Sequence, residues 1–285
     1  MLQRIERIFW LWHQCFISMK KLKTFIPFAI YAAMQFVILI SLVNFVNPPF
    51  VTFYVPLIRK FFGEWALHYP AFFYTLTPLF NQLNFVLSGV VGIILIGVAT
   101  HVFAFNFMRN RVSIRIALRR TFSKYPTLFA IWIVESLITM GVIIGVPYLL
   151  DKFLHPEYPV FRVIEMIALL LGIFMTSIFA YATAYIVLSD QSFIRSIIQT
   201  FATFKQNMLT TFVLVAVPTV AYMPASYFAG KANLIITKFS PEMIATMLGL
   251  GILVSLITNY FQINTITRFY ILLNDKNSVN QNTCV

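Results

Sequence analysis

The sequence predicts an all-α fold, a polytopic six-helix transmembrane bundle with amphipathic helices lying in the membrane plane. Of its 285 residues, 60% are hydrophobic and only 11% are charged, whereas a soluble domain has roughly a quarter of its residues charged. Six apolar segments are long enough to cross roughly 30 Å of hydrocarbon, which takes about 20 helical residues. Three basic amphipathic stretches each precede a pair of these segments.

The six segments are continuous apolar runs, and no polar stretch between them is long enough to fold separately in water. Backbone amides in lipid must bond within their own segment, so helix is the expected state. We therefore expect a single transmembrane domain over residues 1–285. Its spans are predicted near residues 25–46, 84–107, 127–150, 163–188, 209–229 and 243–267.

Lysine and arginine are unevenly distributed between the two sides of these spans. The segments on the side of the N-terminus have fifteen basic residues, and those on the other side have six. The positive-inside rule then predicts a multi-pass protein of the cytoplasmic (inner) membrane with both termini in the cytoplasm. The basic residues that give the chain its net charge of +12 lie beside the spans, so we expect no nucleic-acid partner.

Each of the three amphipathic stretches has an apolar stripe at helical spacing, which predicts a helix in the interface plane. In the second stretch, Arg111, Arg115 and Arg119 form a basic stripe beside the apolar one. The apolar stripes consist of Leu2, Ile5, Phe9, Trp12 and Phe16, then Ile114, Leu118 and Phe122, then Ile194, Ile197, Ile198, Phe201 and Phe204. The chain thus divides into three units, each an in-plane helix followed by two spans.

This layout, with the runs Ile116–Phe122 before Tyr125-Pro126 and Ser196–Phe201 after Asp190, resembles a known family. It is similar to the membrane domain of bacterial glycerophosphodiester phosphodiesterases and to related six-span inner-membrane proteins. The resemblance implies a helical membrane module over most of the chain. It implies no catalytic residues, because the phosphodiesterase chemistry of those proteins belongs to a separate domain.

The connections and glycines give three further expectations. Residues 47–83 are predicted to form an outer loop with a short interfacial helix near residues 58–65. The motifs Ser88-x-x-x-Gly92 and Gly141-x-x-x-Gly145 predict close helix approach inside the chain.

Enzyme signatures are missing from the sequence: it has no HExxH, GxSxG, Walker or glycine-rich dinucleotide motif. The four histidines lie in four separate segments, and Cys15 and Cys284 form no metal-binding spacing. We therefore expect no enzyme activity, no catalytic residues, no metal and no cofactor.

Four polar residues inside the spans share one predicted depth, about 9–13 Å from the inner boundary. They are His101, Glu135, Asn259 and Gln262. Polar groups at this depth usually face the bundle interior. They form either an inner cavity with Glu135 as a proton or cation site, or interhelical hydrogen bonds worth about 0.6 kcal/mol each.

A basic cluster between the second and third spans is a candidate lipid headgroup site. Near an anionic leaflet each basic residue is worth about 1 kcal/mol, although positive-inside bias alone also places charge there. The cluster consists of Arg109, Arg111, Arg115, Arg119, Arg120 and Lys124.

Two functions follow from these features. The first is a non-enzymatic integral membrane protein that organises lipid or a partner protein, with anionic membrane lipids or a membrane protein as partner. The alternative is a transporter or permease with a polar cavity in the inner leaflet around Glu135.

Overall fold

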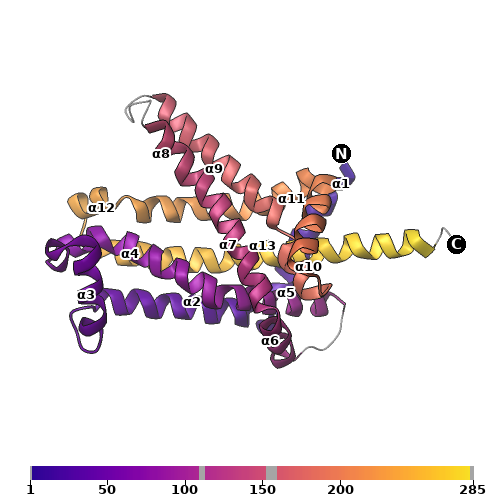
Figure 1. The fold of residues 1–285 in the computed structure, drawn as a ribbon, viewed down its shortest axis with the longest axis horizontal. Coiled ribbons are helices and arrows are strands. Elements are labelled where there is room, and N and C mark those ends of the chain that lie inside the picture. Colours follow the sequence, from indigo (N-terminus) through magenta and orange to yellow (C-terminus); the bar gives the residue numbers. More distant parts are fainter. Residues whose placement is uncertain (1, 109–112, 152–158, 283–285) are drawn as a thin grey trace. The chain divides into compact units, whose positions relative to one another are not determined.

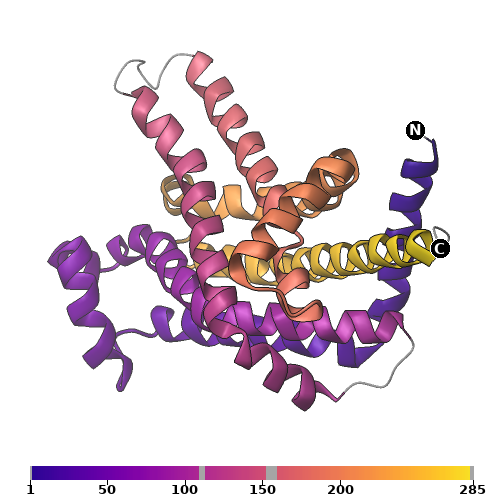
Figure 2. The same ribbon diagram turned by 45° about the vertical axis from the view of Figure 1, so that its right-hand side comes forward.

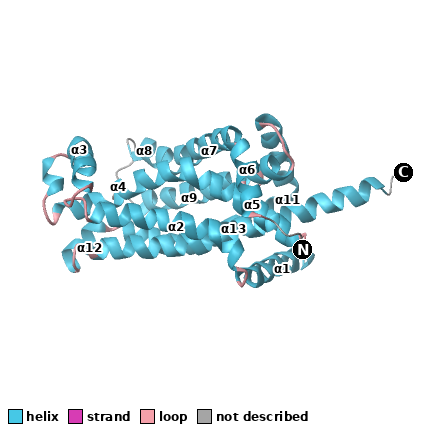
Figure 3. Ribbon diagram, turned by 90° about the horizontal axis from the view of Figure 1, so that it is seen from below, coloured by secondary structure: helices cyan, strands magenta, loops and turns pink. Residues whose placement is uncertain are grey.

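The computed structural model describes residues 2–108, 113–151 and 159–282, and every regular element within them is a helix (Figures 1 and 3). The all-α prediction is confirmed. The elements are α1 (Leu2–Met19), α2 (Leu22–Val43), α3 (Phe50–Phe62), η1 (Glu64–Leu67), α4 (Ala71–Leu87), η2 (Ser88–Gly92), α5 (Ile93–Phe107), α6 (Ile114–Ser123), α7 (Tyr125–Met140), η3 (Gly141–Gly145), α8 (Val146–Asp151), α9 (Pro159–Phe179), α10 (Ala182–Leu188), α11 (Phe193–Gly230), α12 (Ala232–Lys238) and α13 (Met243–Asn282).

Six helical stretches are long and apolar enough to cross a membrane, as the sequence predicts. Each contains one of the predicted apolar segments, or nearly all of it. These stretches are Leu22–Val43, Ala71–Phe107, Tyr125–Leu149, Val163–Leu188, Phe193–Gly230 and Met243–Asn274.

Two predicted boundaries are wrong. The second helix begins at Ala71 rather than near residue 84, so the outer connection is shorter than predicted and the helix has 37 residues. Pro78 lies inside it, where proline removes one backbone donor but does not end the helix. The fifth helix begins at Phe193 because the third amphipathic stretch continues directly into the span, with a non-helical residue at Asn207 (φ −125°, ψ 28°).

The described residues form two compact units, and each is built from segments far apart in the sequence. Unit 1 contains residues 1–25, 93–219 and 261–285. Unit 2 contains residues 26–92 and 220–260. The single-domain assignment over the whole chain stays a prediction.

Unit 2 has a large apolar core where α2, α3, α4 and α13 meet. Leu42, Ile58, Leu76 and Ile244 have no exposed surface, and they belong to one cluster. The predicted outer interfacial helix is α3, which begins earlier than predicted. Its Ile58 is part of this core, whereas Phe61 on the same helix is exposed.

Polar side chains link the helices of unit 2 across this core. The Gln35 amide donates to Asn84 Oδ1 over 2.7 Å, and the Tyr31 hydroxyl donates to the same oxygen over 3.3 Å. The Thr77 hydroxyl donates to the carbonyl oxygen of Ala229 over 2.9 Å. These bonds satisfy polar groups that would be costly to leave unpaired in lipid.

In unit 1, the short helix α6 packs along α5 through small side chains. Ala117 is buried against Val98 of α5. Thr121 lies so close to Gly97 that a Cβ atom at position 97 would collide with its side chain. Small residues permit this close approach between helices, and it leaves the bulky residues of α6 facing outward.

The other two amphipathic helices pack in the same way on the ends of spans. The Asn264 amide of α13 donates to the Ser18 hydroxyl of α1 over 2.6 Å, and Figure 2 shows α1 crossing this end of α13. The Thr203 and Tyr185 hydroxyls, on α11 and α10, form a 2.6 Å hydrogen bond. Each amphipathic helix therefore contacts an even-numbered span through small or hydroxyl side chains, and the division into three units stays a prediction.

Close packing is found at one of the two small-residue motifs and not at the other. Both coincide with π-helical turns, at η2 and η3. A Cβ atom at Gly92 would lie 3.2 Å from Tyr31, so close packing is confirmed there. No atom of the described residues lies within 4 Å of the Cβ positions of Gly141 and Gly145. The prediction of internal close packing at this second motif is wrong, because the motif does not define which face of the helix meets a neighbour.

The close approach in the α7–α9 hairpin (Figures 1 and 2) occurs at Gly172 instead. A Cβ atom there would lie 2.5 Å from Cγ1 of Ile143.

We predict that Gly172→Ala lowers the free energy of unfolding by about 1–2 kcal/mol, because Ile143 must move. Thermal unfolding in detergent measures this loss.

Gly141→Ala is the matched control, because its new methyl group enters open space. It should cause no loss of stability. Equal losses in the two variants would show that the crossing at Gly172 does not limit stability.

Candidate functional site

Two spans of unit 1 end close together, at Phe107 and Leu188, and α13 passes beside them around Tyr270 and Asn274. The elements α1 and α6 and the first part of α11 lie at the same end of the unit (Figure 1). This end, here called the basic end, also has Arg120 and Lys124 on or beside α6. Span ends of this kind lie at the depth of the lipid headgroups.

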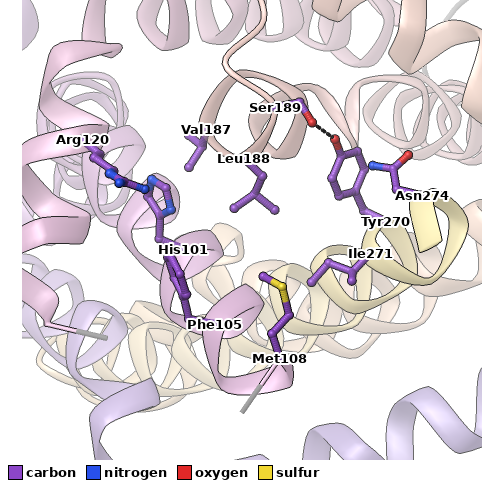
Figure 4. Close-up of a pocket in the computed structure, with 10 residues that line it drawn as sticks. All are labelled: His101, Phe105, Met108, Arg120, Val187, Leu188, Ser189, Tyr270, Ile271 and Asn274. Carbon is purple, nitrogen blue, oxygen red and sulfur yellow. Dashed lines mark hydrogen bonds between the residues drawn. The ribbon is translucent and has the colours of Figure 1, made fainter. Parts of the chain in front are cut away.

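A cavity of about 240 Å³ opens at the basic end (Figure 4). Half of its lining is polar and half is apolar. The polar residues are His101, Arg120, Ser189, Tyr270 and Asn274. The apolar residues are Phe105, Met108, Val187, Leu188 and Ile271. This cavity, here called the basic pocket, suits an amphiphilic ligand better than a purely apolar one.

Helix α5 positions His101 about 9 Å from its end at Phe107. The imidazole stacks on Phe105, with ring centroids 6.1 Å apart. His101 is only 3% exposed, and its Nδ1 has no hydrogen-bond partner among the described residues. The Arg120 guanidinium lies beside it on the pocket wall (Figure 4). Buried polar atoms normally have partners, so this nitrogen is an exception in the wall of the pocket.

On the opposite wall, α10 and α13 are joined by hydroxyl groups. The Ser189 and Tyr270 hydroxyls form a 2.5 Å hydrogen bond, and Asn274 lies beside Tyr270 (Figure 4). The Tyr185 and Tyr270 rings pack edge to face, with centroids 4.8 Å apart. These contacts hold α13 against the end of α10.

An ion pair joins α6 to the turn after α10. Lys124 Nζ lies 2.6 Å from Asp190 Oδ1. The pKa of the Asp190 carboxyl lies below its ordinary value. The largest cause is the hydrogen bond that Lys124 donates, and the positive charge of Lys124 is the next largest. Asp190 also has a left-handed backbone, with φ of 57°, which Asn and Asp tolerate better than other non-glycine residues.

A second polar network lies at the basic end where α1 meets α13. The Arg268 guanidinium donates to Asn264 Oδ1 over 2.7 Å, and its Cζ atom lies 5.5 Å from the Phe107 ring centroid. The Asn264 amide in turn bonds Ser18. Burial raises the pKa of the neighbouring Cys15 thiol to about 12, so this cysteine stays protonated and is a poor nucleophile or metal ligand.

The four predicted intramembrane polar residues have different surroundings. His101 lines the basic pocket, whereas Glu135 and Gln262 do not belong to its lining. Glu135 on α7 and Gln262 on α13 are half-buried. Asn259 belongs to unit 2, and the other three belong to unit 1.

The predicted headgroup residues also divide into groups. Arg109 and Arg111 lie outside the described residues. Arg115, Arg119 and Arg120 are all exposed on α6, and Arg120 also lines the basic pocket. Lys124 is held by Asp190.

Sequence reasoning did not identify the opposite wall of the pocket as part of a site. Ser189, Tyr270 and Asn274 come from two regions far apart in the sequence. One signal was available: Tyr270 and Asn274 are four residues apart and follow the last long apolar run. Within the described ranges, no three His, Cys, Asp or Glu side chains group closely enough to hold a metal ion.

Comparison with protein families, curated proteins and solved structures finds no match. The resemblance to the phosphodiesterase membrane domain therefore stays a prediction. The class of protein follows from the fold itself. Six long apolar helices make the chain a multi-pass integral membrane protein.

The Lys124–Asp190 pair predicts a pH-dependent contribution to stability. Because the pKa of Asp190 is lowered in the folded state, the pair stabilises the fold above the ordinary aspartate pKa. This contribution is lost as pH falls through the folded pKa. Asp190→Asn keeps a residue that tolerates the left-handed backbone and removes the charge. We expect a small drop in melting temperature at neutral pH, since the pair is largely exposed.

The variant and the parent should converge at acidic pH, where Asp190 is protonated. Lys124→Gln should give the same small drop at neutral pH, and the double variant should lose no more than either single one. A constant difference between parent and Asp190→Asn at every pH would contradict the role of the ion pair.

Proposed function

We propose that the chain is a non-enzymatic integral membrane protein that organises anionic lipid in the inner leaflet of the cytoplasmic membrane. The observation that supports this is the outward face of the three amphipathic helices. Phe9 on α1 is 62% exposed, Phe122 on α6 is 64% exposed, and Ile198 on α11 is 62% exposed. Small and hydroxyl residues on another face of the same helices are buried, among them Ser18, Thr121 and Ser196.

Bulky apolar residues that face away from the protein need another apolar environment, and lipid supplies it. Basic residues lie next to these faces: Arg115 and Arg119 on α6 and Arg195 on α11 are exposed. Anionic headgroups attract such residues. The combination matches helices that lie at the lipid surface and gather anionic lipid around the basic end.

The transporter alternative has less support. It expects Glu135 to belong to a polar cavity, and the basic pocket is lined by His101 but not by Glu135. The non-enzymatic assignment rests on the lack of catalytic motifs in the sequence. The cytoplasmic orientation rests on the distribution of basic residues between the two sides.

Spin labels on α11 test the lipid-facing assignment. In membranes, labels at Ile194 and Phe201 should be shielded from a water-soluble quencher, because these residues lie on the outward apolar face. Labels at Arg195 and Gln206, which are exposed on the polar side of the same helix, should stay accessible. Equal accessibility at all four positions would refute a helix at the lipid surface.

Reporter fusions test the orientation. A reporter placed after Lys276, and a second one inserted between Arg109 and Lys124, should both report the cytoplasm. Both positions are on the side with the larger number of basic residues. A signal from the opposite side at either position would reverse the proposed topology.

A further inference from the structure

We propose that the basic pocket binds the phosphate group of an anionic phospholipid, with Arg120 and His101 as its phosphate-binding side chains. This inference rests on the proposed function and goes beyond it by naming a bounded site and a ligand class. The lipid would be held individually, in contrast to the diffuse attraction along the amphipathic helices.

The depth of the pocket fits a headgroup. Two spans end beside it, at Phe107 and Leu188. A lipid in the adjacent leaflet has its phosphate near the span ends and its acyl chains deeper. The apolar half of the lining, with Phe105, Leu188 and Ile271, can contact the glycerol backbone and the upper acyl chain.

The polar half of the pocket fits an anion. Arg120 supplies a guanidinium, which binds phosphate oxygens in a two-pronged arrangement. His101 is almost completely buried, and its Nδ1 has no partner among the described residues. The His101 imidazole lines the pocket, and a ring N–H of this side chain would donate a hydrogen bond to a phosphate oxygen. The nearby carboxylate of Asp190 is already paired with Lys124, so Arg120 leaves the pocket positively charged.

The experiment titrates the detergent-purified full chain with short-chain phosphatidylglycerol, phosphatidylcholine of equal chain length, and inorganic phosphate. The parent should bind phosphatidylglycerol most tightly. Arg120→Gln should weaken this binding about tenfold, as expected for the loss of a charged hydrogen bond. Leu188→Trp, which fills the apolar half and keeps Arg120, should weaken it as well.

Two further variants separate the pocket from general electrostatics. Arg119→Gln removes the same charge from a neighbouring position on α6 that is not part of the pocket lining, so it should weaken binding less than Arg120→Gln. Lys60→Gln, on α3 of unit 2, should have no effect. Equal losses for Arg119→Gln and Arg120→Gln would overturn the pocket in favour of diffuse surface attraction.

The remaining outcomes identify the ligand source. Inorganic phosphate that competes with phosphatidylglycerol, together with unchanged binding in Leu188→Trp, would assign the site to free phosphate and overturn the lipid. Shielded spin labels on α11 with no effect of Arg120→Gln would refute the pocket alone and leave the proposed function standing. Circular dichroism and thermal unfolding confirm that each variant is folded before its affinity is interpreted.

Discussion

The structure of unit 1 depends on one form of packing, in which small and hydroxyl side chains of a short helix contact the end of a membrane-spanning helix. Thr121 against Gly97, Ser18 with Asn264, and Thr203 with Tyr185 are three instances of it. The hydrophobic effect does not drive helices together within lipid, so close contact and hydrogen bonds must do so. Small residues of these helices face the protein, and many of their bulky residues, such as Phe9, Phe122 and Ile198, are exposed.

On α6 this arrangement reverses the usual rule for a surface helix of a soluble protein, in which the large apolar residues face the core: Ile116 and Phe122 are exposed, whereas Ala117 and Thr121 are buried. Helix α1 still buries Leu11 completely. The periodicity predicted amphipathic helices but did not show which face meets the protein. Phe204, predicted on the apolar stripe with Ile194 and Phe201, is buried in the protein while the other two are exposed.

Composition and periodicity were sufficient to predict the helical class, the six apolar segments and the three amphipathic helices, because lipid permits few backbone arrangements. They also identified Arg120 and His101 as candidates. They did not join these two into one pocket, nor include Tyr270 and Ser189, since the pocket forms where helices from distant parts of the chain meet. The packing position Gly172 was likewise missed, because a single glycine has no pattern that distinguishes it from one facing open space.

Helix α11 joins the third amphipathic stretch to the fifth span. Its first part is the third amphipathic helix, and its later part is a span, with Asn207 as the irregular residue between them. The Thr211 hydroxyl donates to the Asn207 carbonyl oxygen, and the Asn207 amide donates to that of Thr203. These bonds brace both sides of the bend. A single helix therefore joins the third amphipathic stretch to the fifth span, and hydrogen bonds on both sides of Asn207 support the join.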